Sequence, residues 1–141
     1  MVFLRIQPGP NAWYVFCVTG LRPEDGLTRV KRVLIVDDEP LIRSGLSKAL
    51  KGLAVVDTAD SGAQAIARVE SRFYDICFLD VLLPDMSGID VMRQIQKTSP
   101  TTRIVVMTAY ADEPTREMIR KEAYRFMEKP LDLSQIKEIV G

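Results

Sequence analysis

The chain has 141 residues, of which 47% are hydrophobic and 27% are charged. That length is typical of one domain, and the apolar fraction supports one hydrophobic core, which excludes a disordered or collagen-like chain. Lysine and arginine total 19, and aspartate and glutamate total 19, so no net positive charge attracts a polyanion. Direct nucleic-acid binding and binding to an anionic membrane surface therefore lack their main electrostatic driving force.

The sequence contains no histidine and two cysteines. The absence of imidazole excludes hydrolytic, zinc and phosphocarrier chemistry that depends on histidine. Two cysteines cannot form a disulfide framework, and Cys77, within an apolar run, is interpreted as a small buried hydrophobic residue. No apolar run approaches the ~20 residues of a membrane-spanning helix, and Pro8, Gly9 and Pro10 interrupt any signal-peptide core. We therefore expect no membrane insertion and a cytoplasmic location.

The composition of the chain changes near residue 30. Proline and glycine punctuate residues 1–29, and no helical or alternating period persists there. The same stretch contains a small aromatic cluster, Trp13, Tyr14 and Phe16. We interpret residues 1–29 as an N-terminal appendage and residues 30–141 as one folded domain. The sequence leaves open whether the appendage is ordered or reflects an over-long assignment of the start.

From residue 31 onwards, short apolar runs alternate with amphipathic segments. Most runs are apolar at consecutive positions, which is typical of strands buried on both faces of a parallel sheet. The intervening segments repeat apolar side chains three or four residues apart, as on one face of a helix. Pro40 and Pro114 suit first helical turns, and the pair Ser61 and Gln64 forms a capping box. The predicted strands are 32–36, 54–56, 76–79, 103–107 and 126–127.

Five strands that alternate with five helices predict an α/β fold, a three-layer sandwich around a parallel sheet. Right-handed crossovers with helices on both faces leave few strand orders, and we expect the flavodoxin-like order 2-1-3-4-5. The helix predicted at 115–123 has the least regular pattern, because charges surround it and only Met118 and Ile119 offer an apolar stripe.

Polar side chains follow four of the predicted strands, at the sheet edge where ligands bind in such folds. They are Asp37 and Asp38 after the first strand, Asp80 after the third, Thr108 after the fourth and Lys129 after the fifth. In the order 2-1-3-4-5 the third strand lies between the first and the fourth. We therefore expect Asp80 at the centre of the cluster.

The residue types in this cluster indicate phosphoryl transfer. Three neighbouring carboxylates repel one another unless a cation intervenes, and Mg²⁺ is a hard divalent ion that prefers oxygen ligands. Lys129 adds a positive charge and Thr108 adds a hydroxyl donor. A metal and an ammonium together can neutralise the oxygens of a transferred phosphoryl group. A carboxylate is a competent nucleophile for this reaction and gives an aspartyl phosphate.

Four motifs, VDDEP, LDVLLPDMSG, MTAY and FMEKP, resemble in order and spacing those of the response-regulator receiver domain of bacterial two-component signalling. The resemblance covers nearly all of the chain outside residues 1–29. It implies that Asp80 is the phosphoacceptor and that Asp37 and Asp38 position Mg²⁺. The backbone carbonyl of Leu82 would supply a further metal ligand.

The resemblance also implies a conformational switch. Thr108 and Lys129 would contact the phosphoryl oxygens, and Phe126 would be the aromatic switch residue. The Lys129–Pro130 peptide bond is expected to be cis, as is usual in the family. Two positions depart from the family pattern: Glu122 stands where glycine is common, and Phe126 lacks the hydroxyl of the more familiar tyrosine. These departures leave the phosphorylation chemistry intact and bear on the partner surface.

By this resemblance the chain is a phosphorylatable switch and not a multi-turnover enzyme. A histidine kinase or a histidine phosphotransfer protein would phosphorylate Asp80 in a Mg²⁺-dependent reaction. We expect the output to be binding of a downstream protein, because no DNA-binding or catalytic module follows before Gly141. The sequence leaves the cognate kinase, the downstream partner and homodimer formation open.

Three alternatives stand beside this interpretation. A phosphatase of the haloacid dehalogenase type shares the nucleophilic aspartate and Mg²⁺, but its motif needs a second aspartate where this chain has Leu82. A structural adaptor would keep the fold without phosphorylation, although every reactive group is present. A flavin- or dinucleotide-binding domain is disfavoured, because no G-x-G-x-x-G run follows the first strand.

Overall fold

The computed structural model describes residues 29–141. Contacts divide the chain into two units, Met1–Val30 and Lys31–Gly141. The predicted appendage lies almost wholly outside the described residues, so it stays a prediction, as does a domain boundary at residue 30. Among the described residues, no helix is both long and apolar enough to cross a membrane.

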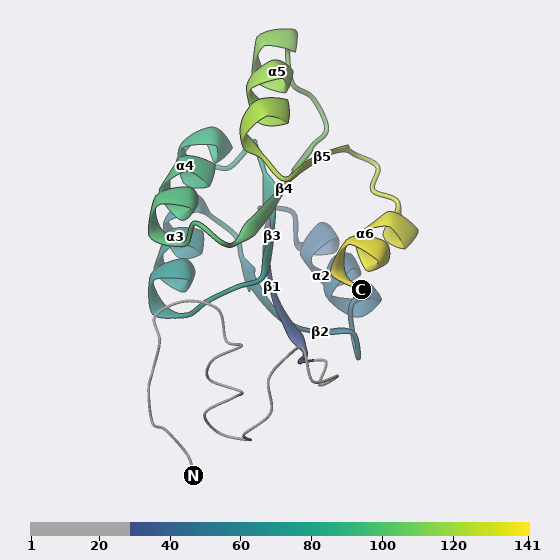
Figure 1. The fold of residues 1–141 in the computed structure, drawn as a ribbon. Coiled ribbons are helices and arrows are strands. Elements are labelled where there is room, and N and C mark those ends of the chain that lie inside the picture. The colour runs from purple at the N-terminus through teal and green to yellow at the C-terminus, as the bar shows by residue number, and fades with distance from the viewer. Residues whose placement is uncertain (1–28) are drawn as a thin grey trace. The chain divides into compact units, whose positions relative to one another are not determined.

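Strands and helices alternate along the described chain (Figure 1). The strands are β1 (Lys31–Val36), β2 (Ala54–Ala59), β3 (Ile76–Asp80), β4 (Arg103–Thr108) and β5 (Arg125–Glu128). The helices are α2 (Pro40–Ala49), α3 (Gly62–Ser71), α4 (Gly88–Thr98), α5 (Glu113–Glu122) and α6 (Leu133–Val140). All strand pairs are parallel, in the order β2-β1-β3-β4-β5. The predicted fold class and strand order are confirmed.

Helices cover both faces of the sheet, with α2 and α6 on one side and α3 and α4 on the other (Figure 1). Successive side chains of a strand point to opposite faces. In β1, Leu34 and Val36 join the apolar cluster that includes α3 and α4, whereas Val33 and Ile35 join the cluster formed with α2 and α6. All four side chains are fully buried. This double burial explains why the central strands read as unbroken apolar runs.

The helix starts follow the predicted signals. Pro40 and Pro114 lie in the first turns of α2 and α5. The hydroxyl of Ser61 accepts a hydrogen bond of 3.2 Å from the backbone N–H of Gln64. The backbone N–H of Asp60 in turn donates a hydrogen bond of 2.8 Å to Oε1 of Gln64. The capping box therefore forms, with its second bond displaced by one residue from the usual N-cap donor.

The two edge strands extend beyond their predicted ends. β2 continues through Asp57 to Ala59, and β5 begins at Arg125 and ends at Glu128. Each pairs on one side only, so polar side chains can lie along it. The Asp57 carboxylate is accommodated because the hydroxyl of Tyr74 donates to its Oδ2 at 2.6 Å. A prediction from apolar periodicity alone therefore makes such edge strands too short.

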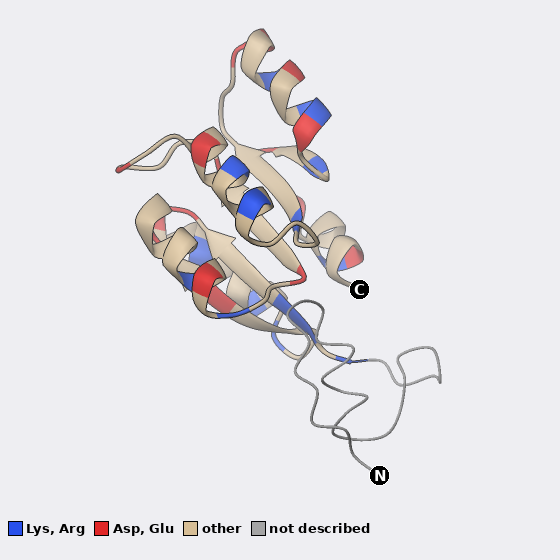
Figure 2. Cartoon of the chain, turned by 60° about the vertical axis from the view of Figure 1, so that its left-hand side comes forward, with Lys and Arg blue, Asp and Glu red and all other residues tan. Residues whose placement is uncertain are grey.

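Most residues of helix α5 are exposed. It begins two residues before its predicted start, and Ile119 is its buried residue. Figure 2 shows both signs of charge along it. Ile119 packs in the same apolar cluster as the residues of α3 and α4. The prediction that Met118 and Ile119 form its apolar stripe is thus confirmed for Ile119, while Met118 is only half-buried.

Candidate functional site

The carboxyl ends of four neighbouring strands position the predicted site residues. Asp37 directly follows β1, Asp80 ends β3, Thr108 ends β4 and Lys129 directly follows β5. Because the strands are parallel, all of these ends lie at one edge of the sheet, where ligands bind in open α/β folds. The Lys129–Pro130 peptide bond is cis, as expected.

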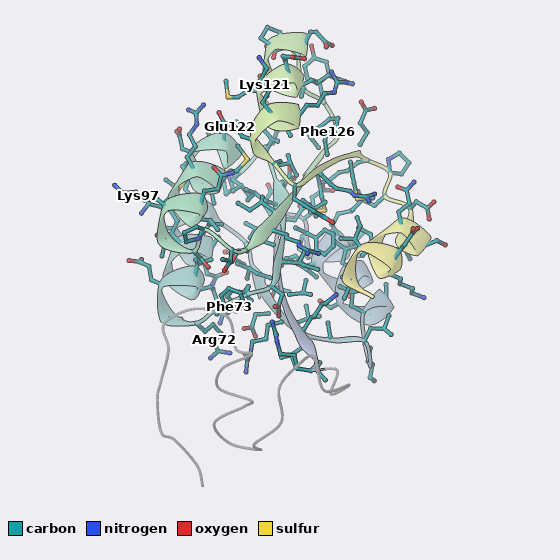
Figure 3. The ribbon with its side chains drawn as sticks, in the orientation of Figure 1. Arg72, Phe73, Lys97, Lys121, Glu122 and Phe126 are labelled. Carbon is teal, nitrogen blue, oxygen red and sulfur yellow. The ribbon has the colours of Figure 1, made fainter. Side chains whose placement is uncertain are left out.

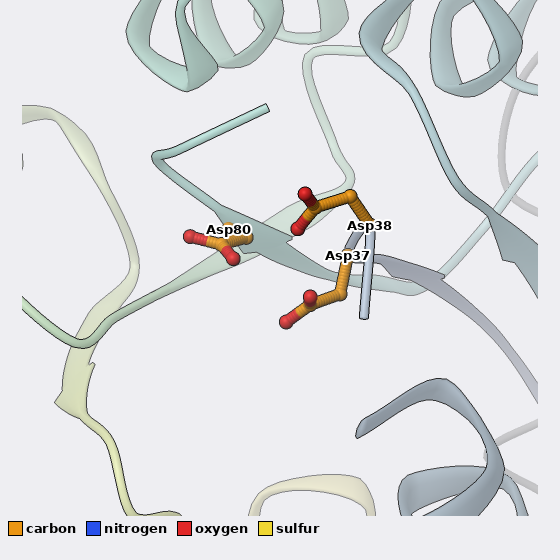
Figure 4. A group of neighbouring side chains, drawn as sticks. All are labelled: Asp37, Asp38 and Asp80. Carbon is orange, nitrogen blue, oxygen red and sulfur yellow. The ribbon is translucent and has the colours of Figure 1, made fainter. Parts of the chain in front are cut away.

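Three carboxylates gather at this edge (Figure 4). Asp37, Asp38 and Asp80 each offer an oxygen, and these oxygens lie within 4.8 Å of one another. Asp37 is 0% exposed and Asp80 is 3% exposed, whereas Asp38 is open to solvent. The cluster therefore combines two buried oxygen donors with one that is accessible from outside.

Backbone N–H groups fix one oxygen of each buried carboxylate. The N–H of Glu39 donates to Asp37 Oδ1 at 2.9 Å, and the N–H of Leu82 donates to Asp80 Oδ1 at 3.0 Å. Each bond spans two residues, as in an Asx turn. The other two oxygens, both Oδ2, lie next to Lys129.

Lys129 places one ammonium among three carboxylates. Its Nζ lies 2.8 Å from Asp37 Oδ2, 3.0 Å from Asp80 Oδ2 and 3.0 Å from Glu39 Oε1. Burial alone would lower the pKa of Lys129, but its ion pair with Asp37 and the hydrogen bonds that it donates to Asp80 and Glu39 outweigh burial and raise the pKa. The ammonium therefore stays charged at neutral pH and draws the acidic side chains together.

The carboxylate of Asp80 is balanced between opposing influences. Burial raises its pKa and the negative charge of Asp37 adds to the rise, while the Leu82 N–H and Lys129 oppose it. The net result is a pKa above the usual aspartate range. A bound cation would remove this electrostatic cost and keep the carboxylate ionised.

The cluster fits a divalent metal ion. Within the described part of the chain, the buried Oδ2 of Asp37 has no well-directed hydrogen bond, although Lys129 lies 2.8 Å away as an ion-pair partner. One ammonium also leaves an excess of negative charge among Asp37, Asp38 and Asp80. Oxygen-only ligands of this kind suit Mg²⁺. The predicted contribution of the Leu82 carbonyl stays a prediction.

The two predicted switch residues lie on neighbouring strands, Thr108 at the end of β4 and Phe126 within β5. Thr108 is fully buried, and its hydroxyl donates to the carbonyl of Tyr110 at 2.7 Å. Phe126 is half-buried and packs against the apolar cluster that contains Ile119. Figure 3 marks Phe126 beside α5. The guanidinium carbon of Arg116 lies 5.9 Å from the centroid of its ring.

Two residues of the site went unpredicted. Glu39 belongs to the VDDEP run and adds a third carboxylate at the Lys129 ammonium. Arg43, one turn into α2, donates from Nη1 to the backbone carbonyl of Asp37 at 2.8 Å. The acidic run itself was a signal for Glu39, whereas nothing in the spacing of Arg43 indicated its contact.

A third unpredicted residue anchors the loop that follows β3. The two oxygens of Asp85 accept the N–H groups of Gly62 and Ala63 at 2.8 and 2.9 Å. These are the first residues of α3, so a negative charge stands at a helix N-terminus, where it is favoured. The hydrogen bonds from Ala63 and Gly62 lower the pKa of Asp85. The loop that leaves Asp80 is thereby tied to α3.

Comparison with known proteins identifies the family. Residues 33–141 match the model of the response regulator receiver domain. Chemotaxis protein CheY of Thermotoga maritima is 33% identical over 114 residues, which are 79% of this chain and 95% of CheY. Response regulator protein PilR of Pseudomonas aeruginosa is 36% identical over 114 residues, which are 79% of this chain and 25% of PilR. The chain likewise covers 25% of regulatory protein AtoC of Escherichia coli.

Solved structures of response regulators also match this chain. A CheY-like receiver domain protein of Methanospirillum hungatei JF-1 matches with a TM-score of 0.74 and 26% identity, over 79% of this chain and 94% of that chain. Response regulator TrrA of Thermotoga maritima, solved in complex with Mg²⁺ and BeF, matches with a TM-score of 0.70 and 33% identity, over 79% and 96% of the two chains. Strand order, acidic cluster and sequence similarity agree, and the chain belongs to the response regulator receiver domain family.

Proposed function

We propose that this receiver domain accepts a phosphoryl group on Asp80 from a phosphohistidine donor and signals by binding a partner. The observation that supports this proposal best is the environment of Asp80. Its carboxylate is buried beside Asp37, and Lys129 Nζ lies 3.0 Å from its Oδ2. One carboxylate nucleophile, an acidic pair and a fixed ammonium are the parts that phosphoryl transfer needs.

In the proposed reaction an oxygen of Asp80 attacks phosphorus. A new O–P bond forms, the bond from phosphorus to the donor's imidazole nitrogen breaks, and that nitrogen takes up a proton. Lys129 would offer its positive charge to the phosphoryl oxygens, because its ammonium already lies at the Asp80 carboxylate. The chain itself is changed once per transfer, so we propose a switch and not a multi-turnover enzyme.

Asp37, Asp38 and Asp80 would hold Mg²⁺, with the carbonyl of Leu82 as a further ligand. When bound, the metal would supply positive charge that neutralises the oxygens of the transferred group. The role of the protein is to keep the carboxylates close despite their repulsion. The N–H groups of Glu39 and Leu82 do so by fixing one oxygen each of Asp37 and Asp80.

The proposed output is a shift between two conformations. A phosphoryl group on Asp80 would attract the hydroxyl of Thr108, which otherwise donates to Tyr110. The space that Thr108 leaves would admit the ring of Phe126. This would bias the surface formed by α5, β5 and α6, to which a downstream protein would bind. The donor would be a histidine kinase or a histidine phosphotransfer protein, and the predicted cytoplasmic location stays a prediction.

Labelling with a small acyl phosphate tests the proposal. The protein is incubated with Mg²⁺ and acetyl phosphate, and the bound phosphoryl group is counted and mapped by mass spectrometry. We expect one group on Asp80 and none in Asp80→Asn. Asp60→Asn is the matched control, because Asp60 is an exposed carboxylate that follows β2 at the same edge. Labelling that persists in Asp80→Asn would refute the assignment.

Two further measurements separate the alternatives. A phosphorylated histidine phosphotransfer protein should pass its label to the wild type and not to Asp80→Asn. Continuous release of phosphate from a simple phosphomonoester, with many turnovers per chain, would favour a phosphatase instead.

A further inference from the structure

We infer that Arg116 couples the two switch residues, because it holds both the loop after Thr108 and the ring of Phe126 in the arrangement of the unmodified protein. The inference rests on the proposed function and deepens it by naming a residue that sets the balance between the two conformations. Arg116 touches none of the reacting groups, so it is a positioning residue.

Three contacts converge on the guanidinium of Arg116. Its Nε donates to the carbonyl of Ala111 at 2.9 Å, and its Nη1 forms an ion pair with Glu128. Its central carbon lies 5.9 Å from the centroid of the Phe126 ring. The side chain is 27% exposed. One planar group thus joins α5 to the loop after β4 and to β5.

Two side chains hold the loop after β4 by hydrogen bonds to the backbone carbonyls of two consecutive residues, Tyr110 and Ala111. Thr108 donates its hydroxyl hydrogen to Tyr110, and Arg116 donates to Ala111. A hydroxyl group has one hydrogen, so Thr108 cannot donate to a phosphoryl oxygen and to Tyr110 at the same time. Phosphorylation of Asp80 would remove the first of these restraints and leave Arg116 as the second.

The ring of Phe126 depends on Arg116 for a related reason. Phenylalanine has no hydroxyl that could fix the ring by a hydrogen bond. A guanidinium over an aromatic face is attractive, and at this distance it favours the present position of the ring. The ion pair with Glu128 strengthens this arrangement, since Glu128 lies on the same strand as Phe126.

Side chains of α4 hold the C-terminal half of helix α5, where Gln96 donates to the carbonyl of Glu122 at 2.8 Å and Arg93 contacts Met118. Ile119 is the buried residue of α5. Near its C-terminus, Arg93 of α4 pairs with Glu122 at 3.2 Å, and Figure 3 marks Glu122 at that end. Arg116 supplies the contacts at the end nearer the site. Because Arg116 joins the first half of α5 to the loop after β4 and to β5, it can shift the equilibrium of the surface formed by α5, β5 and α6.

The test is an equilibrium titration with beryllofluoride in excess Mg²⁺, a stable mimic of the phosphoryl group, followed by amide NMR. A ligand that prefers the active conformation binds more tightly when the resting conformation is weakened. We expect the half-saturating concentration to fall about threefold in Arg116→Gln, given the strength of such contacts at partly exposed sites. Arg116→Lys, which keeps the charge and loses the planar fork, should shift it less in the same direction.

Arg120→Gln is the matched control, because Arg120 lies one turn further along α5 and pairs with Glu113 at 3.2 Å. It should titrate like the wild type. In a Phe126→Leu background, Arg116→Gln should lower the half-saturating concentration by less than threefold. The reason is that part of the effect of Arg116 depends on its contact with the Phe126 ring. Denaturation curves establish that each variant is folded.

The results separate the two proposals. If the wild type binds beryllofluoride at Asp80 while Arg116→Gln and Arg116→Lys titrate like it, the coupling is refuted and the phosphoacceptor stands. If Arg116→Gln still lowers the half-saturating concentration threefold in the Phe126→Leu background, coupling through the ring is also refuted. If the wild type binds no beryllofluoride, both proposals fail.

Discussion

A Cβ atom on Gly88 would lie 2.5 Å from the backbone carbonyl oxygen of Asp80, closer than side chains approach such atoms. The same Cβ would lie 2.5 Å from the Cα of Val81. Both neighbours are backbone atoms of the segment that leaves β3, so they can yield only if the site loop moves. The first residue of α4 is thus glycine because strand β3 ends against it.

We predict that Gly88→Ala destabilises the protein by about 1–3 kcal/mol, the range for overpacking. Gly45→Ala is the control, because nothing lies within 4 Å of a Cβ at that position in α2. Alanine is the better helix former, so Gly45→Ala should stabilise by about 0.5–1 kcal/mol. Urea denaturation measures both. Equal effects of the two substitutions would contradict the close approach at Asp80.

The pKa of Asp85 predicts a dependence of stability on acid. It is lowered by the N–H groups of Ala63 and Gly62, so its contribution is fully present above the unfolded-state value of about 3.9. That contribution is lost as the pH falls through the lower folded-state value. The melting temperature of Asp85→Asn should therefore lie below that of the wild type at pH 7, with a gap that closes in acid. A gap that is constant with pH would contradict this account.

Binding of Mg²⁺ should raise the melting temperature. A ligand that binds only the folded state stabilises it by about 2.7 kcal/mol at one hundred times its dissociation constant. Asp38→Asn should reduce the shift, because it removes an accessible oxygen of the acidic cluster without disturbing the buried pair. Asp60→Asn should keep the full shift. Equal shifts in all three proteins would place the metal elsewhere.

The hydrogen bond between Tyr74 and Asp57 should support the edge of the sheet. Tyr74 is 1% exposed and donates to Asp57 Oδ2 at 2.6 Å. Burial, and to a lesser extent this hydrogen bond, raises the pKa of the Tyr74 hydroxyl. Tyr74→Phe should cost about 1–3 kcal/mol in the free energy of unfolding, because a partly buried hydrogen bond to a charged carboxylate is lost. Tyr124→Phe, at a half-exposed ring, should cost less than about 0.5 kcal/mol. Urea denaturation compares the two.

The sequence predicts the central sheet well because burial on both faces dictates an unbroken run of four apolar side chains within each of β1, β3 and β4. The site residues are predictable for the same reason: a polar residue that ends such a run marks the strand end where ligands bind. Asp80 after four apolar residues is the clearest case. The edges of the sheet are less predictable, since Asp57 is accommodated in β2 through its contacts with Tyr74 and Arg72.

The contacts that hold the site are not encoded by spacing. Glu39 meets Lys129 directly after β5, Asp85 meets the start of α3, and Arg116 meets Glu128 on β5. From the sequence alone, these three residues would be interpreted as solvated charges at helix starts or on a helix surface. Their roles emerge only when the fold brings the loops together, because long side chains reach several positions and periodicity constrains none of them.

A crystal structure with Mg²⁺ and beryllofluoride tests the central claim most directly. We predict that the beryllium group is bonded to a carboxylate oxygen of Asp80 and that the metal is held by Asp37 and Asp80. The ammonium of Lys129 should face the fluorine atoms. A beryllium group on any other carboxylate, or a metal bound away from Asp37 and Asp80, would contradict the account.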